Sequence, residues 1–357
     1  MMRALGAGGY RIALAALAVL FLVFVASTFG LREWPFELLS HFVLQYFLGA
    51  AFLCLAFASI GKKTPAAAAL VLSLVFAADF QQAPQTLSDM RPASIGVANA
   101  SVVNNQGLPS RRLSLITYNV SRLNDQSADV AAWLATKPAD VIALVEMSNG
   151  MAGALQALRN VYPHQFTVEP GATLNSEVYA GNESLAVLSI HPITEQTIVR
   201  PSGQGKLSLL AKLSMQNAED PWIVVVHPSN PTTPHRLVSR DFYLFDLAEL
   251  IAELQGPVIA AGDFNVTPYA PAFPLFLKAS RTSTARSFPA TWPSMLGPLG
   301  IPIDHILIRE ARITSVEAFP SVGSDHRALK AEILLPTVVE QRNAGDTHVS
   351  GWHPPAS

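Results

Sequence analysis

Residues 258–265 read VIAAGDFN, and this stretch decides the fold. Four apolar residues in a row, VIAA, are typical of a strand that is buried on both faces of a sheet. The strand ends in Gly-Asp-Phe-Asn, which brings the polar side chains of Asp263 and Asn265 to its carboxyl end. Taken alone, this segment is also a plausible turn, because Asp and Asn bond their own backbone. The other strands of the chain must therefore decide between a turn and a site.

Several other apolar stretches also meet polar residues at their ends. These polar residues are Asn119, Glu146, His227, Asp304, Asp325 and His326. Ligands of layered α/β proteins sit where strands end, and a buried charge is costly unless it is paired or bound to metal. We therefore expect these residues to gather with Asp263 and Asn265 in one functional site. His305, next to Asp304 in an extended strand, is expected to face the other way.

Strand and helix patterns alternate through the segment 111–336. Strands are expected at 112–119, 140–145, 185–189, 207–213, 222–226, 258–261, 303–308, 313–318 and 328–334. Helices are expected at 127–136, 150–160 and 236–254. Many buried strands with helices between them predict sheets that pack under helical layers. The segment is long enough for one domain with two such sheets.

The N-terminal part has the composition of a membrane anchor. Half of the 357 residues are apolar and 14% are charged, and the apolar excess lies in residues 1–83. Runs 12–31 and 38–60 hold 20 and 23 residues without a charge, enough for a helix to cross a bilayer. The third run, 65–80, is shorter and Ala-rich, so it either spans the membrane or lies as an interfacial or buried helix. The anchor therefore has two or three transmembrane helices.

Flanking charges predict the orientation of the anchor. Arg3 and Arg11 precede the first run, and Lys62 and Lys63 separate the second from the third. The positive-inside rule places the N-terminus and the Lys62-Lys63 loop in the cytoplasm. With three spans the segment 111–336 lies outside the membrane, and with two it stays in the cytoplasm. We expect a multi-pass protein of the inner (plasma) membrane, with this segment on the periplasmic or extracytoplasmic side.

Two further segments have the composition of connecting or terminal chain. Residues 84–110 are rich in polar and small residues and are expected to form a linker. Residues 337–357 are expected to form a disordered tail. Cys54 is the single cysteine of the chain, so neither a disulfide within the chain nor a cysteine metal site is expected.

Taken in order, these motifs resemble the endonuclease/exonuclease/phosphatase (DNase I-like) superfamily, and in detail its membrane-attached bacterial branch. The pieces that carry the resemblance are TYN at 117–119, Glu146, VVVH at 224–227, GDFN at 262–265, IDHILI at 303–308 and GSDH at 323–326. The superfamily includes nucleases, neutral sphingomyelinases and inositol polyphosphate 5-phosphatases. The resemblance implies an α/β fold for 111–336, a four-layer α/β/β/α sandwich, preceded here by transmembrane helices.

The resemblance also implies a metal site. Glu146 would be the main ligand of Mg²⁺, with Asn119 and Asp325 around the metal or its waters; Mn²⁺ is the alternative ion. Magnesium is a hard ion that takes oxygen ligands, often one or two carboxylates with waters and phosphate. Asn182 stands where the family often places a polar residue that contacts the phosphate.

The remaining site residues would act on the phosphoester itself. By resemblance, Asp263 would orient and deprotonate the attacking water, and Asn265 would hold the charge that develops on the phosphoryl group. His326, oriented by Asp304, would donate a hydrogen bond to a phosphoryl oxygen. His227 would be the second histidine of the site, on the other side of the scissile phosphate.

These expectations predict a membrane-tethered, Mg²⁺-dependent hydrolase of phosphoric esters. The substrate would be a phosphodiester, of a nucleic acid as for a nuclease or of a phospholipid headgroup, cleaved by in-line attack of water. The segment beyond residue 83 is mildly acidic, which argues against the basic face of a strong nucleic-acid binder. The alternative is a catalytically silent binding or scaffold protein on the same fold. The expected partners are the substrate and the lipid bilayer, and no protein partner is inferred.

Overall fold

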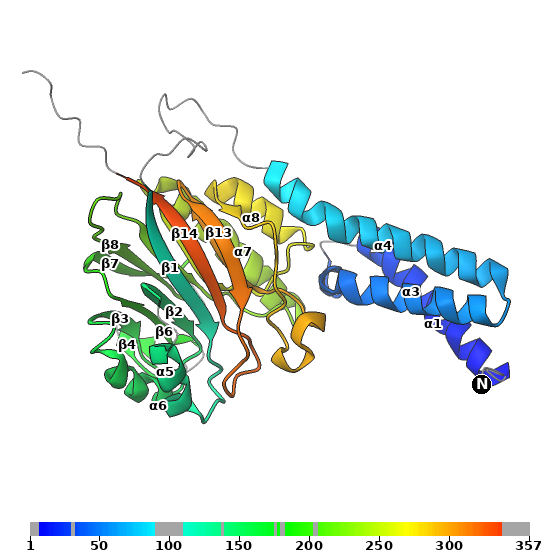
Figure 1. The fold of residues 1–357 in the computed structure, drawn as a ribbon, viewed down its shortest axis with the longest axis horizontal. Helices are drawn as coiled ribbons and strands as arrows, with labels where there is room; N and C mark the ends of the chain where they lie inside the picture. Colours follow the sequence, from blue (N-terminus) through cyan, green and yellow to red (C-terminus); the bar gives the residue numbers. More distant parts are fainter. Residues whose placement is uncertain are drawn as a thin grey trace, which may run out of the picture.

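The computed structural model divides the chain into an N-terminal bundle of helices and a two-sheet domain beside its end (Figure 1). The structure describes residues 7–29, 33–89, 110–136, 139–174, 177–178, 183–202 and 206–337. Asn182, residues 90–109 of the expected linker and all but the first residue of the expected tail lie outside these ranges.

Three long helices and a short elbow form the bundle. Its elements are α1 (Ala7–Phe29), α2 (Phe36–Leu39), the 3-10 turn η1 (Ser40–Phe42), α3 (Val43–Ser59) and α4 (Lys63–Asp89). Ala50, Phe57 and Ala69 are fully buried where the helices meet. Three helical stretches are long and apolar enough to cross a membrane: Gly8–Ser27, Phe36–Ser59 and Lys63–Gln81. The third apolar run is thus long enough as well, because its helix begins earlier and ends later than the sequence pattern.

Helix α4 corrects one expected boundary. Residues 84–89 were expected to begin the linker, but they continue α4 as far as Asp89. Residues 84–89 read PQTLSD, and most of these residue types are poor helix formers, so their composition gave no sign of a helix. A helix that has already begun adds residues more easily than it starts, which lets α4 continue through them.

The first sheet of the domain has six strands in the order β13-β14-β1-β2-β6-β3. The strands are β1 (Ser110–Asn119), β2 (Val141–Val145), β3 (His164–Val168), β6 (Leu185–Ser189), β13 (Arg312–Ala318) and β14 (Leu329–Pro336). Strand β1 is central and runs parallel to β2 and antiparallel to β14. Their shared register brings Asn119 opposite Val145, so Glu146 follows at the same edge of the sheet.

The second sheet also has six strands, in the order β11-β12-β10-β9-β8-β7. The strands are β7 (Ile193–Val199), β8 (Ser208–Leu213), β9 (Trp222–Val226), β10 (Val258–Asp263), β11 (Ser283–Thr284) and β12 (Asp304–Arg309). Strands β9 and β10 are parallel, and β12 pairs antiparallel with β10 so that Asp263 lies opposite Asp304. A separate short hairpin joins β4 (Thr173–Leu174) to β5 (Glu177–Val178).

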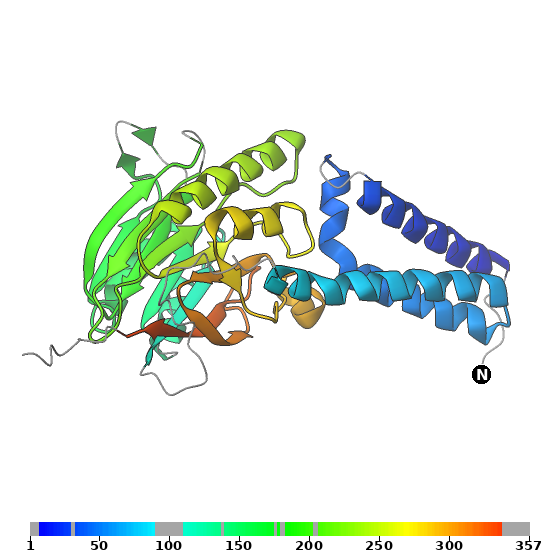
Figure 2. The ribbon, with the colours of Figure 1, turned by 90° about the horizontal axis from the view of Figure 1, so that it is seen from above.

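The two sheets face each other, and helices cover their outer faces. Leu115 of the first sheet and Ile259 of the second belong to the same buried cluster between the sheets. The outer face of the second sheet packs under α7 (Pro234–Glu253) and α8 (Ala272–Ser280), as Figure 2 shows. The outer face of the first packs under α5 (Ser127–Thr136), α6 (Asn149–Ala154) and the turn η2 (Leu155–Leu158). The four-layer α/β/β/α sandwich predicted from the sequence is confirmed.

Sequence patterns missed the edge strands β3, β7 and β11, the short hairpin strands β4 and β5 and the helix α8. An edge strand is paired on one side only and needs no unbroken apolar run, and β7 is exposed along its middle. Helix α8 is short and holds Pro274 in its first turn, where its missing N–H is not needed.

Candidate functional site

The GDFN segment sits tightly against the end of β9, and Gly262 makes this possible. A Cβ atom on Gly262 would lie 2.0 Å from the carbonyl oxygen of Val226, and its φ of 153° disfavours other residues. Glycine therefore lets β9 and β10 approach closely at their carboxyl ends. The approach brings Asp263, at the end of β10, beside His227, the residue that follows β9.

The loop after Asp263 holds a turn that uses the carboxylate. The backbone N–H of Asn265 donates to Oδ1 of Asp263 at 2.9 Å, and Asn265 adopts a left-handed conformation with φ of 51°. Its side-chain amide donates to the carbonyl of Pro228 at 3.1 Å. The segment GDFN is therefore a turn and at the same time part of the site. The turn fixes one oxygen of Asp263 and leaves the other directed at its neighbours.

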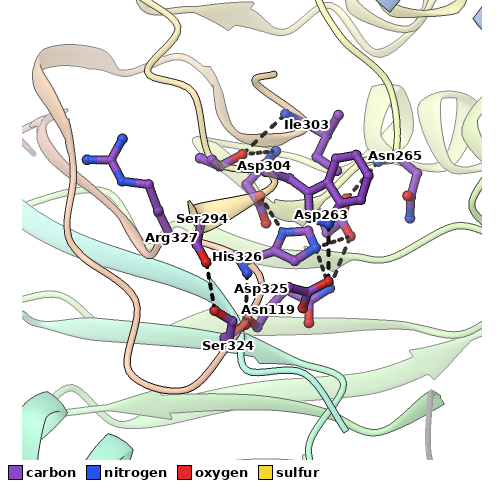
Figure 3. A network of polar contacts seen from close by, with 12 residues as sticks. Asn119, Asp263, Asn265, Ser294, Ile303, Asp304, Ser324, Asp325, His326 and Arg327 are labelled. Atoms are coloured by element: carbon purple, nitrogen blue, oxygen red, sulfur yellow. Dashed lines mark hydrogen bonds and ion pairs between the residues drawn. The ribbon is translucent and has the colours of Figure 1, made fainter. Parts of the chain in front are cut away.

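Four buried side chains form one polar network at these strand ends (Figure 3). His326 Nδ1 lies 2.8 Å from Asp304 Oδ2, and His326 Nε2 lies 3.7 Å from Asp263 Oδ2. The amide of Asn119 donates to Asp263 Oδ2 at 3.1 Å and lies 3.4 Å from His326 Nε2. Asn119, Asp263, Asp304 and His326 come from four separate strands or loops, and the structure brings them together.

Charges within this network shift the acidity of its members. Burial by itself would lower the pKa of His326, but the carboxylates of Asp304 and Asp263 outweigh it and raise the pKa to about 10. Burial raises the pKa of Asp263 well above that of an ordinary carboxyl, with Asp304 adding to the rise and His326 opposing it. At neutral pH the network thus holds a charged imidazole beside a carboxyl that takes up a proton more readily than usual.

Glu146 and His227 form a second pair at the same edge. Glu146 follows β2 in a left-handed conformation with φ of 55°, and its Oε1 lies 3.2 Å from His227 Nε2. Burial by itself would raise the pKa of Glu146, but His227, His326 and Lys206 together lower it to about 2. Glu146 is therefore ionised at any working pH. The His227 N–H donates to the hydroxyl of Tyr243 at 3.1 Å.

Asp325 lies beside the network rather than inside it. Its side chain is exposed, and Oδ2 accepts a hydrogen bond from Trp292 Nε1 at 3.1 Å. Its charge is among those that raise the pKa of His326. Figure 3 shows Asp325 near Asn119 below the imidazole. All eight residues singled out in the sequence thus lie at strand ends or in the loops beside them, with Asp325 and Asn265 turned partly to neighbours outside the network.

Sequence reasoning missed several residues that support the site. Ser324 donates through Oγ to the Asn119 carbonyl at 2.7 Å and accepts from the His326 N–H. Thr291 Oγ1 accepts from the N–H of Asp304 at 3.3 Å. Ser324 stands inside the GSDH motif and could have been found there, whereas Thr291 meets Asp304 only through the fold.

Lys206 is a further cation of the site that the patterns did not indicate. It lies just before β8, and its charge acts on Glu146. Burial lowers the pKa of Lys206, and the charges of Glu183 and Glu146 partly restore it. Lys206 lies outside every motif that carried the resemblance, so its position gave no signal in the sequence.

Comparison with known proteins supports the fold and the family. A model of the Endonuclease/Exonuclease/phosphatase family matches residues 116–326. No curated protein matches the chain. Among solved structures, an endonuclease/exonuclease/phosphatase from Beutenbergia cavernae has 16% identity and a TM-score of 0.51, covering 63% of this chain and 72% of that one.

Two further solved structures have the same architecture at similarly low sequence identity. D. rerio TDP2 in complex with single-strand DNA product has 17% identity and a TM-score of 0.51, covering 62% of this chain and 98% of that one. The human Nocturnin catalytic domain with bound sulfate has 16% identity and a TM-score of 0.50, covering 62% and 94%. Identities this low show a shared fold and nothing about substrate.

Proposed function

Because the chain belongs to the endonuclease/exonuclease/phosphatase family, whose model matches residues 116–326, we propose that it is a membrane-tethered, divalent-metal-dependent phosphoesterase. The single observation that carries the proposal is the buried network of Asn119, Asp263, Asp304 and His326. A base and a charged hydrogen-bond donor held side by side suit attack of water on phosphorus.

In this proposal Asp263 takes a proton from the attacking water. The raised pKa of Asp263 suits a general base, because the best catalytic pKa lies near the working pH. Asn119 and the Asn265 N–H hold the two oxygens of Asp263 in place. The water oxygen bonds to phosphorus as the ester P–O bond opposite it breaks, and the leaving oxygen takes up a proton from solvent and departs as an alcohol.

His326 would stabilise the charge that develops on the phosphoryl oxygens. Its raised pKa keeps the imidazole charged at neutral pH, and Asp304 fixes the Nδ1 side of the ring. Asn265 would add its amide to the same group. His227, paired with Glu146, would contact the phosphoryl group from the other side. Donors that are already oriented before reaction cost no reorganisation when the charge appears.

The residues that would hold the metal are Glu146, Asn119 and Asp325. They offer carboxylate and amide oxygens, the ligands that Mg²⁺ and Mn²⁺ prefer, and Glu146 stays ionised because its pKa is about 2. The left-handed backbone of Glu146 is an unfavourable conformation that the surrounding fold maintains. When bound, such an ion neutralises phosphoryl oxygens and lowers the pKa of a bound water.

A second set of possible ligands lies close by. Asp263, Asp304 and His326 each place a ligand atom within 4.8 Å of the others. Both ring nitrogens of His326 already face carboxylates, at 2.8 and 3.7 Å, and a charged imidazole has no lone pair for a metal. We therefore assign this set to proton handling and Glu146 to the metal.

The proposed substrate is a phosphodiester, of a nucleic acid or of a phospholipid headgroup. Three helices long enough to cross a membrane support a membrane tether, which we propose lies in the inner (plasma) membrane. With three spans the catalytic segment, 111–336, would lie on the extracytoplasmic side. A net charge of −2 over the chain argues against strong attraction to nucleic acid, so the lipid headgroup is the first candidate to test.

The test uses the full-length protein in detergent or in lipid nanodiscs. Plasmid DNA, a sphingomyelin-type lipid and an inositol phosphate are offered with Mg²⁺ or with chelator. We expect Mg²⁺-dependent turnover of one of them, lost in Glu146→Gln and kept in Glu195→Gln, whose side chain is 56% exposed. A folded protein that binds Mg²⁺ weakly or not at all and cleaves none of them would favour the silent scaffold instead.

A further inference from the structure

The membrane anchor contacts the loop that follows Asp263 directly at two residues, and it reaches a third through Arg240 of the domain. The loop residues are Asn265, Thr267 and Tyr269, and the anchor reaches them from the elbow, residues 36–42, and from α4. Figure 2 shows this end of the bundle against the edge of the domain. The three contacts are of different kinds, namely a buried charged link, a hydrogen bond and an aromatic stack, so the interface is specific.

The first contact runs through Arg240 of α7, which is fully buried. Its Nη1 donates to the carbonyl of Asn265 at 3.2 Å, and its Nη2 donates to Oε1 of Glu37 at 2.7 Å. Asp241 accepts from the same guanidinium at the protein surface. Glu37 is itself 3% exposed. A buried guanidinium depends on its partners, so Glu37 of the anchor helps to fix the group that holds the Asn265 carbonyl.

The second contact joins His41 to Thr267, and both residues are buried. Thr267 places its N–H 3.3 Å and its Oγ1 2.9 Å from His41 Nδ1. An N–H can only donate, so Nδ1 is the acceptor and Nε2 carries the ring proton. That Nε2 lies 3.4 Å from Oε2 of Glu37. Glu37 therefore lies beside both Arg240 and His41, the two side chains that connect the elbow to the loop.

The third contact is aromatic. The ring of Phe80 in α4 stacks on Tyr269, with centroids 5.7 Å apart and planes at 27°. Nearby, Gln45 of α3 donates to the carbonyl of Leu299 at 2.8 Å. This carbonyl lies in the segment Ser294–Leu299, whose Ser294 N–H bonds the carbonyl of Asp325. The anchor thus contacts two segments that adjoin the candidate site, the loop after Asp263 and the segment Ser294–Leu299.

We propose that the elbow of the anchor is a positioning element of the active site, acting through Glu37 and Arg240 on the Asn265 loop. Asn265 is left-handed and its N–H holds Asp263. A backbone in that conformation persists where its surroundings over-determine it, and the anchor supplies part of those surroundings. The inference rests on the proposed function for its effect on turnover. It predicts that docking of the anchor sets the rate of the reaction, so the tether does more than hold the domain near a membrane.

The test compares Glu37→Gln with Glu33→Gln in the full-length protein in lipid nanodiscs. Glu33 is an exposed acid four residues earlier on the same segment, which makes it a matched control. We expect Glu37→Gln to lower kcat about tenfold or more, since small misplacements at a reacting centre are costly. KM and Mg²⁺ affinity stay within the range of the control, whereas the melting temperature falls, because the buried guanidinium of Arg240 loses a charged partner. In Arg240→Lys the loss is similar, and adding Glu37→Gln to it costs little more.

A second readout does not depend on catalysis. Amide hydrogen exchange of residues 264–269 should be faster in Glu37→Gln than in wild type, and unchanged in Glu33→Gln. If the wild type cleaves no phosphoester, the proposed function fails while this exchange still decides the positioning. Wild-type kcat and wild-type exchange in Glu37→Gln would overturn the positioning itself. If that variant does not fold, Arg240→Lys, which keeps the charge but lacks the fork that joins Glu37 to the Asn265 carbonyl, takes its place with the same expectations.

Discussion

His326 Nδ1 lies 2.8 Å from Asp304 Oδ2, and both side chains are buried. Asp304 opens β12 and lies opposite Asp263 in the sheet, so one register places two carboxylates on either side of the same imidazole. The distance from His326 Nε2 to Asp263 Oδ2, 3.7 Å, leaves Asp263 the looser partner. Asp304 is therefore the closer carboxylate and favours the charged ring, and in the proposed mechanism Asp263 keeps the freedom to handle a proton.

Replacing Asp304 with Asn should lower kcat by about 10²-fold, within the range of a lost acid–base group. Burial then acts on His326 with one opposing carboxylate fewer, so its pKa falls from about 10. The variant should lose its remaining activity as pH rises through this lower pKa, at a pH where the wild type is still active. A pH–rate profile measures both effects, with Asp129→Asn, an exposed acid of α5, as control.

The same shift makes a prediction for stability. A folded pKa above the ordinary value of 6.5 means that the ion pair stabilises the fold fully below that pH. The contribution is lost as pH rises through about 10. Wild type and Asp304→Asn should therefore differ most in melting temperature at neutral pH or below, and converge towards pH 10. A gap that stays constant from pH 7 to pH 10 would contradict a charged His326.

Glu146→Gln should weaken Mg²⁺ binding roughly tenfold or more, because the change removes the charge of the main proposed ligand. Glu146 has a pKa of about 2, so binding by the wild type should not vary with pH around neutrality through this residue. Titration calorimetry of the full-length protein measures the affinity, beside Glu195→Gln. Unchanged affinity in Glu146→Gln, with binding lost in Asp304→Asn, would place the ion among Asp263, Asp304 and His326 instead.

Gly262→Ala should destabilise the domain strongly. The new Cβ would meet the Val226 carbonyl oxygen at 2.0 Å, and either β9 or the GDFN loop must move. We expect a loss of more than about 3 kcal/mol, or a melting temperature lower by roughly 10 °C. Gly153→Ala, in α6 with no atom within 4 Å of the added Cβ, is the matched control and should be neutral or slightly stabilising. Equal melting temperatures for the two variants would refute the close approach.

His305 gives a prediction in the acid range. It is buried among Phe264, Phe273 and Phe288, and burial lowers its pKa to about 4. The unfolded chain then binds the extra proton between pH 6.5 and about 4, so stability falls as pH falls through that window. His305→Gln should remove up to about 3 kcal/mol of this dependence. Denaturant titrations at pH 7 and pH 4.5 measure the free energy of unfolding of wild type and variant. If His305 did not titrate there, both proteins would lose the same amount between the two pH values.

Much of the fold could be predicted from local sequence patterns, because several strands are buried on both faces and are therefore unbroken apolar runs. Both faces of β10 are buried, Ile259 between the sheets and Ala260 under the helices, and this produces the unbroken apolar run VIAA. Strand β7 has one paired edge and an exposed middle, so it lacks an unbroken apolar run, and its β-branched residues were the only sign of a strand. Hydropathy patterns detect strands that are buried on both faces and miss edge strands that are only partly buried.

Some residues of the site could likewise be predicted from the sequence, and others could not. Asp263, Asp304 and His326 stand next to apolar strands, and their positions in sequence already indicated a common edge. Their roles remain predictions. Arg240 carried no such signal, because it lies in the middle of a helix with charged neighbours. Glu37 likewise precedes an apolar run and resembles any helix-start acid. Only the tertiary contact of 2.7 Å between them shows that they act together.

The account is tested most directly by hydrolysis in ¹⁸O-labelled water by the full-length protein, followed by ³¹P NMR of the product. We predict Mg²⁺-dependent turnover of a phosphodiester with the label on phosphorus and none in the released alcohol, at a rate that Asp263→Asn lowers at least 10²-fold. Label in the alcohol, or no turnover by a folded protein that binds Mg²⁺ through Glu146, would contradict attack of water on phosphorus at this site.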